Sequence, residues 1–170
     1  MHFPRKVRIV EVGARDGLQN ESVPVATATK LELIRRLSDS GLTHVEAASF
    51  VSPRWVPQMA DHREIMLALR DSHANSTTAK SATTYSALTP NMKGLEAALE
   101  CGVREVAVFG SASESFSQRN INCSIAESLE RFAPVVEHAL KAGVRVRGYV
   151  SCVLGCPYEG EIAPAEVAAV

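Results

Sequence analysis

Several features that define other protein classes are missing from this sequence. No stretch approaches the run of about 18 apolar residues that reads as a membrane-spanning helix. The 18 Lys and Arg residues nearly balance the 19 Asp and Glu residues, which gives a formal charge of −1. Such a balance provides no basic surface for nucleic acid or for an anionic membrane. We therefore expect neither a membrane protein nor a nucleic-acid partner.

Cysteines are few, and the common signal segments are missing. Cys152 and Cys156 are spaced like half of a zinc clip, but no second pair and no nearby histidine completes it. We therefore expect free thiols in a reducing cytosol. The first residues, MHFPRKVRIVE, pass almost directly into an apolar segment and leave no room for a signal or transit peptide. A cytoplasmic location is expected.

Strand-like and helix-like segments alternate along the chain, at about 30 to 35 residues per unit, the length of a βαβ unit. Repeated βα units predict a parallel sheet with helices outside it. The expected strands are residues 7–12, 43–48, 80–88, 103–109 and 144–150. The expected helices begin with a capping box at Thr29, at Asp61, at Met92, with a capping box at Ser124, and at Pro164.

Two architectures fit this alternation. A doubly wound sheet can be completed in 170 residues, whereas an eight-stranded (β/α) barrel typically needs about 250, and periodicity alone favours the former. However, neither Gly-x-Gly-x-x-Gly nor a phosphate-binding Gly-x4-Gly-Lys-Ser/Thr motif is present. Polar residues also follow several strands rather than one, which is typical of a barrel's upper rim. The sequence stops inside its last helical segment, as a cut chain would.

The first candidate site follows the first expected strand. Gly13 interrupts the strand, and Arg15, Asp16 and Gln19 come directly after it. An aspartate oxygen can bind a hard divalent cation, and an arginine can stabilise a developing oxyanion with two donors. The competing interpretation is a solvated loop in which the adjacent charges have no special role.

Other candidates lie on or after later strands. Glu46 sits among apolar neighbours, and a buried carboxylate there is rarely idle. Arg147 and Tyr149 alternate with valines, which indicates either a polar barrel interior or an exterior salt bridge. The helix beginning at Ser124, behind a serine-rich loop, offers an N-terminus to an anion such as phosphate. No His-x-His or His-x3-His pair occurs, so Asp16 is the one metal-ligand candidate.

Five stretches together resemble the hydroxymethylglutaryl-CoA lyase family: VEVGARDGLQNE, EAASFVSPRWVPQMAD, LTPNMKGLEAA, FGSASESFSQRNINCSI and RGYVSCVLGCPYEG. The resemblance implies a (β/α)8 TIM barrel that requires Mg²⁺ or Mn²⁺. It implies cleavage of 3-hydroxy-3-methylglutaryl-CoA to acetyl-CoA and acetoacetate, a step of leucine degradation and ketone-body formation.

The resemblance also implies roles for individual residues. Asp16 matches a metal ligand, and Arg15 matches the residue that stabilises the enolate. Glu46 matches a catalytic carboxylate at the metal side. Gln19, Arg147 and Tyr149 are expected to face the substrate, and the loop after the fourth strand is expected to contact coenzyme A.

The sequence departs from the family's pattern in one respect. The family's His-x-His ligand pair, an Asn ligand and a loop cysteine are missing, and neither Cys152 nor Cys156 is assigned to that loop cysteine. We therefore interpret residues 1–170 as the first five βα units of one barrel domain, cut within the fifth helix. An open sheet exposes an unpaired edge and apolar faces. We therefore expect this chain alone to be inactive, and poorly soluble unless another copy covers the edge, as in a homodimer.

Two alternatives to the lyase remain open. A Claisen-type synthase of the same barrel group, such as a citramalate or isopropylmalate synthase, runs related chemistry in the condensing direction. A catalytically incomplete subunit that binds coenzyme A or a partner is the second. The lyase produces acetoacetate, whereas the synthase produces a 2-hydroxy diacid. The catalytically incomplete subunit is distinguished by the absence of divalent-cation binding.

Overall fold

The fold is built on one parallel sheet. The computed structural model describes residues 4–75 and 83–170. Its four strands lie in chain order, and each pairs in parallel with the next along the chain: β1 (His44–Ser49), β2 (Thr84–Leu88), β3 (Glu105–Ser111) and β4 (Arg145–Ser151). The predicted parallel α/β architecture is therefore confirmed, although one expected strand did not form.

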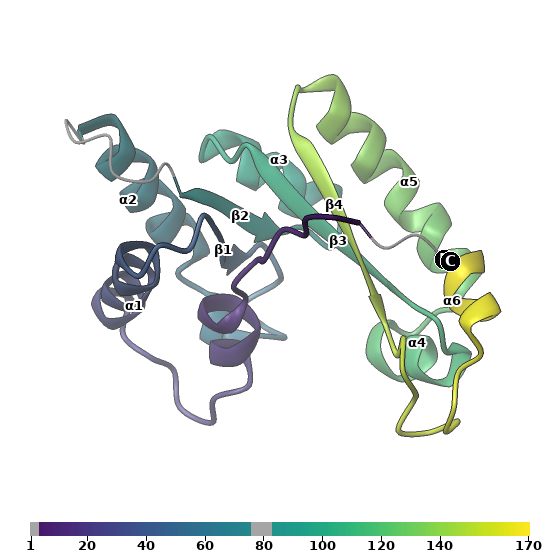
Figure 1. Cartoon of the computed structure of the whole chain (residues 1–170). Helices are drawn as coiled ribbons and strands as arrows, with labels where there is room; N and C mark the ends of the chain where they lie inside the picture. The colour runs from purple at the N-terminus through teal and green to yellow at the C-terminus, as the bar shows by residue number, and fades with distance from the viewer. Residues whose placement is uncertain (1–3, 76–82) are drawn as a thin grey trace.

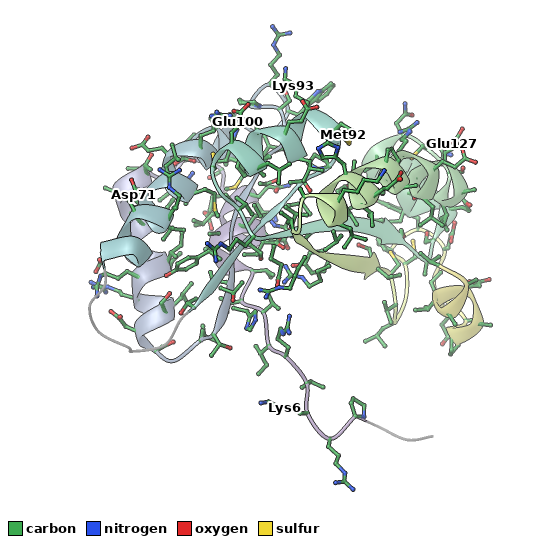
Figure 2. The ribbon with its side chains drawn as sticks, turned by 90° about the horizontal axis from the view of Figure 1, so that it is seen from above. Lys6, Asp71, Met92, Lys93, Glu100 and Glu127 are labelled. Carbon is green, nitrogen blue, oxygen red and sulfur yellow. The ribbon has the colours of Figure 1, made fainter. Side chains whose placement is uncertain are left out.

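Helices cover one face of this sheet and leave the other face open (Figures 1 and 2). The main helices are α1 (Thr27–Asp39), α2 (His62–Asn75), α3 (Met92–Glu100) and α5 (Ile125–Lys141). Shorter elements are η1 (Gly13–Gly17), η2 (Pro57–Met59), α4 (Glu114–Ile121) and α6 (Pro164–Ala169). No helix of the described residues is both long and apolar enough to cross a membrane.

The covered face holds the hydrophobic core. Val45 and Val106 point from the strands toward the helices and are fully buried, as are Ile34 of α1 and Leu95 of α3. Helix α3 approaches the end of β1 so closely that a Cβ on Gly94 would lie 2.6 Å from the backbone oxygen of Phe50. Because each fully buried aliphatic side chain contributes about 1.5–3 kcal/mol, this layer fixes the positions of the strands.

The first expected strand, residues 7–12, did not form. Only Glu11 pairs with β1, through an isolated bridge to Val45: its N–H donates to the His44 oxygen at 3.0 Å, and its oxygen accepts from the Glu46 N–H at 2.8 Å. The side chains of Val7 and Ile9 are about 70% exposed, since no second strand among the described residues lies against the segment. A β-branched pattern alone does not make a strand without neighbours.

Of the two capping boxes predicted from the sequence, one is present in the structure and one is not. Ser124 caps α5 in a complete capping box with Glu127, as predicted. The box predicted at Thr29 is wrong: α1 begins at Thr27, and Glu32 instead pairs with Arg35 and Arg36.

Helix α3 and two of the strands lie close to their expected positions, whereas helix α4 was not expected. Helix α3 spans the predicted residues 92–100, and β2 lies within its expected range, although residues 80–82 fall outside the described part of the chain. Strand β4 is displaced by one residue from the expected range 144–150. Helix α4 was expected to be a loop. Its two serines lower helix propensity, but Ser113 caps it by accepting the N–H of Phe116 at 3.0 Å.

Candidate active site

A π-helical turn, η1, places the first candidate residues. The N–H groups of Arg15 and Asp16 both donate to the oxygen of Val12, at 3.0 and 2.7 Å. Gly13 donates its N–H to Glu11 Oε1 at 2.6 Å, and a Cβ on this glycine would lie 2.7 Å from the same oxygen. Single π-turns are frequent at functional sites. Here the turn directs Arg15 inward, where its side chain is 9% exposed, and leaves that of Asp16 56% exposed.

Glu46 is the centre of the buried polar network on the open face. Its side chain is fully buried. Oε1 accepts from Arg15 Nε at 2.6 Å, and Oε2 accepts from Arg147 Nη2 at 2.5 Å and from the Tyr149 hydroxyl at 2.8 Å. The structure thus brings together four of the residues singled out in the sequence. Because hydrogen bonds between ionised groups are about twice as strong as neutral ones, Glu46 fixes both guanidinium groups.

Glu105, at the start of β3, is a second buried carboxylate that the sequence analysis missed. Its Oε1 accepts from Arg147 Nη1 at 3.0 Å, its Oε2 accepts from Arg145 Nε at 3.1 Å, and Arg8 Nη1 lies 3.8 Å from Oε2. Like Glu46, it is a charged residue within an apolar strand segment. That shared feature was the available signal, since a fully buried glutamate is almost always paired.

Tyr149 keeps its proton within this network. Burial and the neighbouring Glu46 carboxylate raise the pKa of the Tyr149 hydroxyl to about 12, although Arg147 opposes the shift. The hydroxyl is therefore a donor to Glu46 at neutral pH. The ring also lies beneath both guanidinium groups, with the Cζ atoms of Arg147 and Arg15 at 5.0 and 5.9 Å from its centroid.

Two groups of the η1 region have unused oxygen atoms. The Oε1 atom of Gln19 is buried and finds no hydrogen-bond partner within residues 4–75 and 83–170. Asp16 Oδ1 accepts from Arg15 Nη1 at 2.7 Å, which leaves Oδ2 available in a half-exposed position. Such an oxygen suits a hard divalent cation. The described residues contain no group of three or more His, Cys, Asp or Glu side chains that would complete a metal site.

The anion site predicted at the N-terminus of α5 is occupied by two of the chain's own glutamate side chains. At the start of α5, the N–H of Ile125 donates to Glu114 Oε2 at 3.1 Å, and Glu127 accepts from the N–H of Ser124 at 2.8 Å. These carboxylates take the place of an external anion, which argues against a phosphate at this helix end.

The cysteines are free thiols, as expected. Cys156 Sγ accepts from the Ser113 hydroxyl at 3.0 Å and from the Tyr158 N–H at 3.4 Å. Although burial raises the pKa of the Cys156 thiol, these hydrogen bonds lower it overall. The GCPYEG stretch is thereby fixed against the start of α4.

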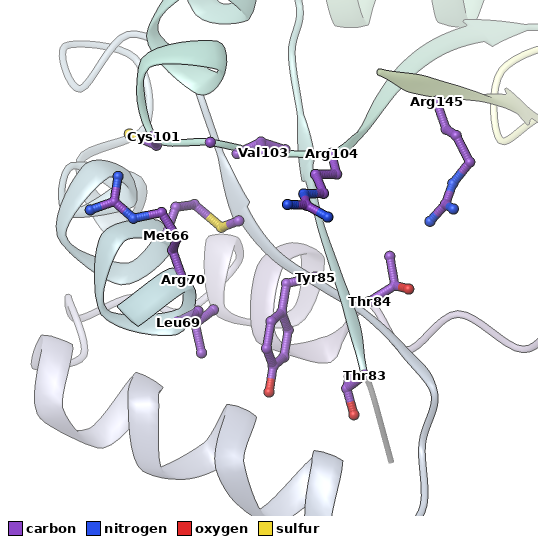
Figure 3. A pocket seen from close by; sticks show the side chains of 11 residues that line it. Met66, Leu69, Arg70, Thr83, Thr84, Tyr85, Cys101, Val103, Arg104 and Arg145 are labelled. Carbon is purple, nitrogen blue, oxygen red and sulfur yellow. The ribbon is translucent and has the colours of Figure 1, made fainter. Parts of the chain in front are cut away.

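A cavity of about 530 Å³ lies at the other end of the sheet (Figure 3). It opens at the amino-terminal ends of β2, β3 and β4, and its lining includes Met66, Tyr85, Cys101, Arg104 and Arg145. In (β/α) barrels the catalytic groups lie at the carboxyl-terminal ends of the strands. The position of this cavity therefore does not support a catalytic role, and the site is better placed around Arg15 and Asp16.

Comparisons with known proteins identify the family of this chain. The chain is 58% identical over 168 residues to the 3-hydroxy-3-isohexenylglutaryl-CoA/hydroxymethylglutaryl-CoA lyase of Pseudomonas aeruginosa, covering 99% of this chain and 53% of that protein. A crystal structure of hydroxymethylglutaryl-CoA lyase from P. aeruginosa superimposes with a TM-score of 0.85 at 57% identity, over 99% of this chain and 54% of that chain.

A third relative was solved with ligands. The HMG-CoA lyase from A. baumannii, in complex with coenzyme A and 3-methylmalate, superimposes with a TM-score of 0.81 at 33% identity, over 95% of this chain and 50% of that chain. The chain thus spans about half the length of the relatives it matches.

These likenesses confirm the fold class. The four-stranded parallel sheet with helices on one face is part of a (β/α)8 TIM barrel. The HMGL-like family profile matches residues 6–170, nearly the whole sequence. The chain belongs to the HMGL-like family.

Proposed function

We propose that this chain supplies the amino-terminal half of a hydroxymethylglutaryl-CoA lyase. The reaction cleaves 3-hydroxy-3-methylglutaryl-CoA to acetyl-CoA and acetoacetate, as in leucine degradation and ketone-body formation. The observation that carries the proposal is the placement of Arg15. Glu46 holds its Nε at 2.6 Å, beside the half-exposed Asp16, in a chain 58% identical to a lyase of this name.

The chemistry needs a stabiliser of negative charge at the thioester. A base removes the proton of the tertiary C3 hydroxyl, the C2–C3 bond breaks as the C3 ketone forms, and the electron pair moves to the thioester enolate. Protonation of C2 then yields acetyl-CoA. Arg15 is the residue that stabilises the enolate, because a fixed guanidinium lowers the energy of charge that develops only during bond cleavage.

Asp16 is proposed as one ligand of a divalent cation, Mg²⁺ or Mn²⁺. Its free Oδ2 atom and its half-exposed position fit this role, and the carboxylate suits a hard cation. When bound, such a cation lowers the pKa of a coordinated hydroxyl and orients the substrate. We propose that the other ligands of the cation come from the part of the barrel outside residues 1–170.

The neighbouring residues orient Arg15 and the substrate. Both oxygens of Glu46 are occupied by donors, so the geometry favours Glu46 as a positioning residue over a base. Arg147 and Tyr149 hold Glu46 from β4 and complete the floor of the substrate site. The unpaired Oε1 of Gln19 is available to accept a hydrogen bond from the substrate.

The proposal includes the rest of the molecule. Residues 1–170 form part of one barrel domain, and a carboxyl-terminal half completes it. We further propose a homodimer, in which a second copy contributes to covering exposed apolar surface, and a binding site for the coenzyme A moiety, which the ligands of the A. baumannii structure support. The four free cysteines support a reducing compartment, the cytoplasm.

The test uses a completed barrel, in which Val170 is followed by the remaining residues of the P. aeruginosa lyase. With Mg²⁺ and 3-hydroxy-3-methylglutaryl-CoA we expect acetyl-CoA and acetoacetate in equal amounts, and no product after chelation with EDTA. The synthase alternative predicts instead a 2-hydroxy diacid from acetyl-CoA and a 2-oxo acid. A folded completed barrel that cleaves nothing under these conditions would refute the lyase proposal.

The chain alone is the matched control. We expect purified residues 1–170 to be inactive, because they offer a single metal ligand. Cleavage by this chain at the rate of the completed barrel would refute the proposed need for a second half. Calorimetric titration with Mn²⁺ distinguishes the non-catalytic alternative, which predicts that even the completed barrel binds no divalent cation.

A further inference from the structure

We propose that Glu105 is a positioning residue for the lyase reaction: by binding Arg147 it fixes the guanidinium that holds Glu46, and through Glu46 it fixes Arg15. This inference rests on the proposed function. It assigns a role to a residue whose hydrogen bonds go to Arg145 and Arg147 and not to Arg15 or Asp16. Three features of the open face of the sheet support this role.

The first feature is the distance that Arg147 has to span. Strands β1 and β4 are the outermost strands of the sheet, with β2 and β3 between them. Neighbouring strands lie about 4.8 Å apart, so Arg147 and Glu46 have to extend toward each other over β2 and β3, and Arg147 Nη2 lies 3.3 Å from Ser86 Oγ on the way. An arginine with a single hydrogen-bond partner keeps much of its rotamer freedom. A second anchor removes that freedom.

The second feature is that Glu105 provides this anchor. Arg147 Nη1 donates to Glu105 Oε1 at 3.0 Å, while Nη2 donates to Glu46 Oε2 at 2.5 Å. The Nε atom of Arg147 is buried and finds no partner in the described part of the chain. Nη2 also donates to the Tyr149 hydroxyl at 2.8 Å, so the orientation of the guanidinium plane depends on Glu105 at Nη1 and on Glu46 and Tyr149 at Nη2.

The third feature is charge. Arg15 and Arg147 are both buried or nearly so, with side chains 9% and 20% exposed, and both bind Glu46. One carboxylate between two guanidinium groups leaves an excess buried positive charge, which is costly in a low-dielectric interior. The Glu105 carboxylate, 3% exposed, balances the second arginine. Without it, Arg147 Nη1 would lose its carboxylate partner, and a shift of Arg147 would move Glu46 and with it Arg15.

The simpler explanation is that Glu105 only ties β3 to β4. Its other oxygen does bind Arg145, whose side chain is 60% exposed. The two explanations can be separated with Arg145→Gln. This change removes the ion pair between Glu105 and Arg145 that links β3 to β4, but it leaves the hydrogen bond between Glu105 and Arg147 intact.

The test measures kcat and KM for 3-hydroxy-3-methylglutaryl-CoA in the completed barrel carrying Glu105→Gln, which keeps the side-chain shape and removes the charge. We expect kcat to fall roughly 10-fold with KM nearly unchanged, a loss below the ~10²-fold that a displacement of 1 Å can cause. Arg145→Gln is expected to leave kcat unchanged. The matched control is Glu100→Gln, which breaks an exposed pair with Arg63 (2.5 Å) and is also expected to leave kcat unchanged.

A second readout does not depend on the reaction. The solvent exchange rate of the Arg15 Nε–H, measured by ¹⁵N NMR, is expected to be slow in the parent and faster in Glu105→Gln. A lowered melting temperature with unchanged kcat and unchanged Nε–H exchange would overturn the inference and leave Glu105 a structural residue. If the parent cleaves no substrate, the proposed function fails, and the exchange rate alone still decides whether Glu105 positions Arg15.

Discussion

The two faces of the four-stranded sheet use the same strands for different purposes. On the helix-covered face, Val45 and Val106 are fully buried among aliphatic side chains such as Leu95. On the open face, residues one position away carry charge: Glu46 follows Val45, and Glu105 precedes Val106. The side-chain period of two in a strand makes this possible. The covered face holds the strands in place, and the open face presents the groups that can do chemistry.

The comparison also shows how the open face tolerates charge. Both glutamates are at most 3% exposed, yet every one of their oxygens has a cationic or hydroxyl partner. Removing one partner of a buried pair costs more than removing an exposed pair. Changes on the covered face should therefore alter stability alone, whereas changes on the open face should alter catalysis as well as stability.

The largest expected effect lies on the open face. In the completed barrel, Arg15→Met should lower kcat by about 10²–10³-fold, as loss of a preorganised oxyanion donor does. Arg36→Met removes an exposed arginine of α1 that pairs with Glu32 and serves as the control. Steady-state kinetics with the lyase substrate check both variants. Similar kcat values for the two variants would contradict the assignment of Arg15.

On the covered face, Leu95→Ala should lower the free energy of unfolding by about 2–5 kcal/mol, because it leaves a cavity in a fully buried position. The kcat of the protein that remains folded should not change. Urea denaturation of the completed barrel, with kcat measured below the transition, checks this prediction. A large loss of kcat without loss of stability would show that the two faces are not separable in this way.

A smaller effect is expected in the helix layer. Ser124→Ala removes the capping hydrogen bond to the Glu127 N–H (3.1 Å) and should cost about 1 kcal/mol of stability. Thr29→Ala is the matched control, since Thr29 lies exposed inside α1 and does not cap it. The difference between their urea midpoints measures the cap. Equal losses would indicate that the capping box contributes nothing specific.

The smallest expected effect is that of the Tyr149 hydroxyl on the pH dependence of stability. It is smallest at neutral pH and grows at alkaline pH. The unfolded phenol has a pKa of about 10, whereas the folded pKa is raised to about 12. Between these values the unfolded state releases a proton that the folded state retains, so stability should fall as pH rises. Unfolding at about pH 9 and about pH 11.5 should show a larger fall for the parent than for Tyr149→Phe. An equal fall in both would refute the raised pKa.

The sequence predicted the covered face better than the open one. Alternating valines and the helix starts at Met92 and Ser124 depend on nearby residues, so α3 and the start of α5 were predicted closely. The first strand failed because its stability depends on neighbours that lie far away in the sequence or outside these residues. Helix α4 was missed because serine favours loops unless one serine caps the helix.

The candidate site was predicted as a set of residues but not as a network. The positions of Arg15 and Glu46 were found from their places after a strand and within a strand. Their direct contact joins residues 31 positions apart, and Arg147 lies 101 positions from Glu46. No local pattern encodes such pairings. Glu105 had the same signal as Glu46, a charge in an apolar strand, and was overlooked because it lies at the amino-terminal end of its strand.

The most direct test of the central claim is chemical rescue of Arg15→Ala in the completed barrel. Arg15 is buried and held by Glu46, so its truncation leaves a space beside a fixed carboxylate. If the Arg15 guanidinium stabilises the enolate, kcat should be low in this variant and should rise when methylguanidinium is added, but not when methylammonium is added, because only the former presents two forked donors. A variant that keeps the parental kcat without any added guanidinium would contradict the account.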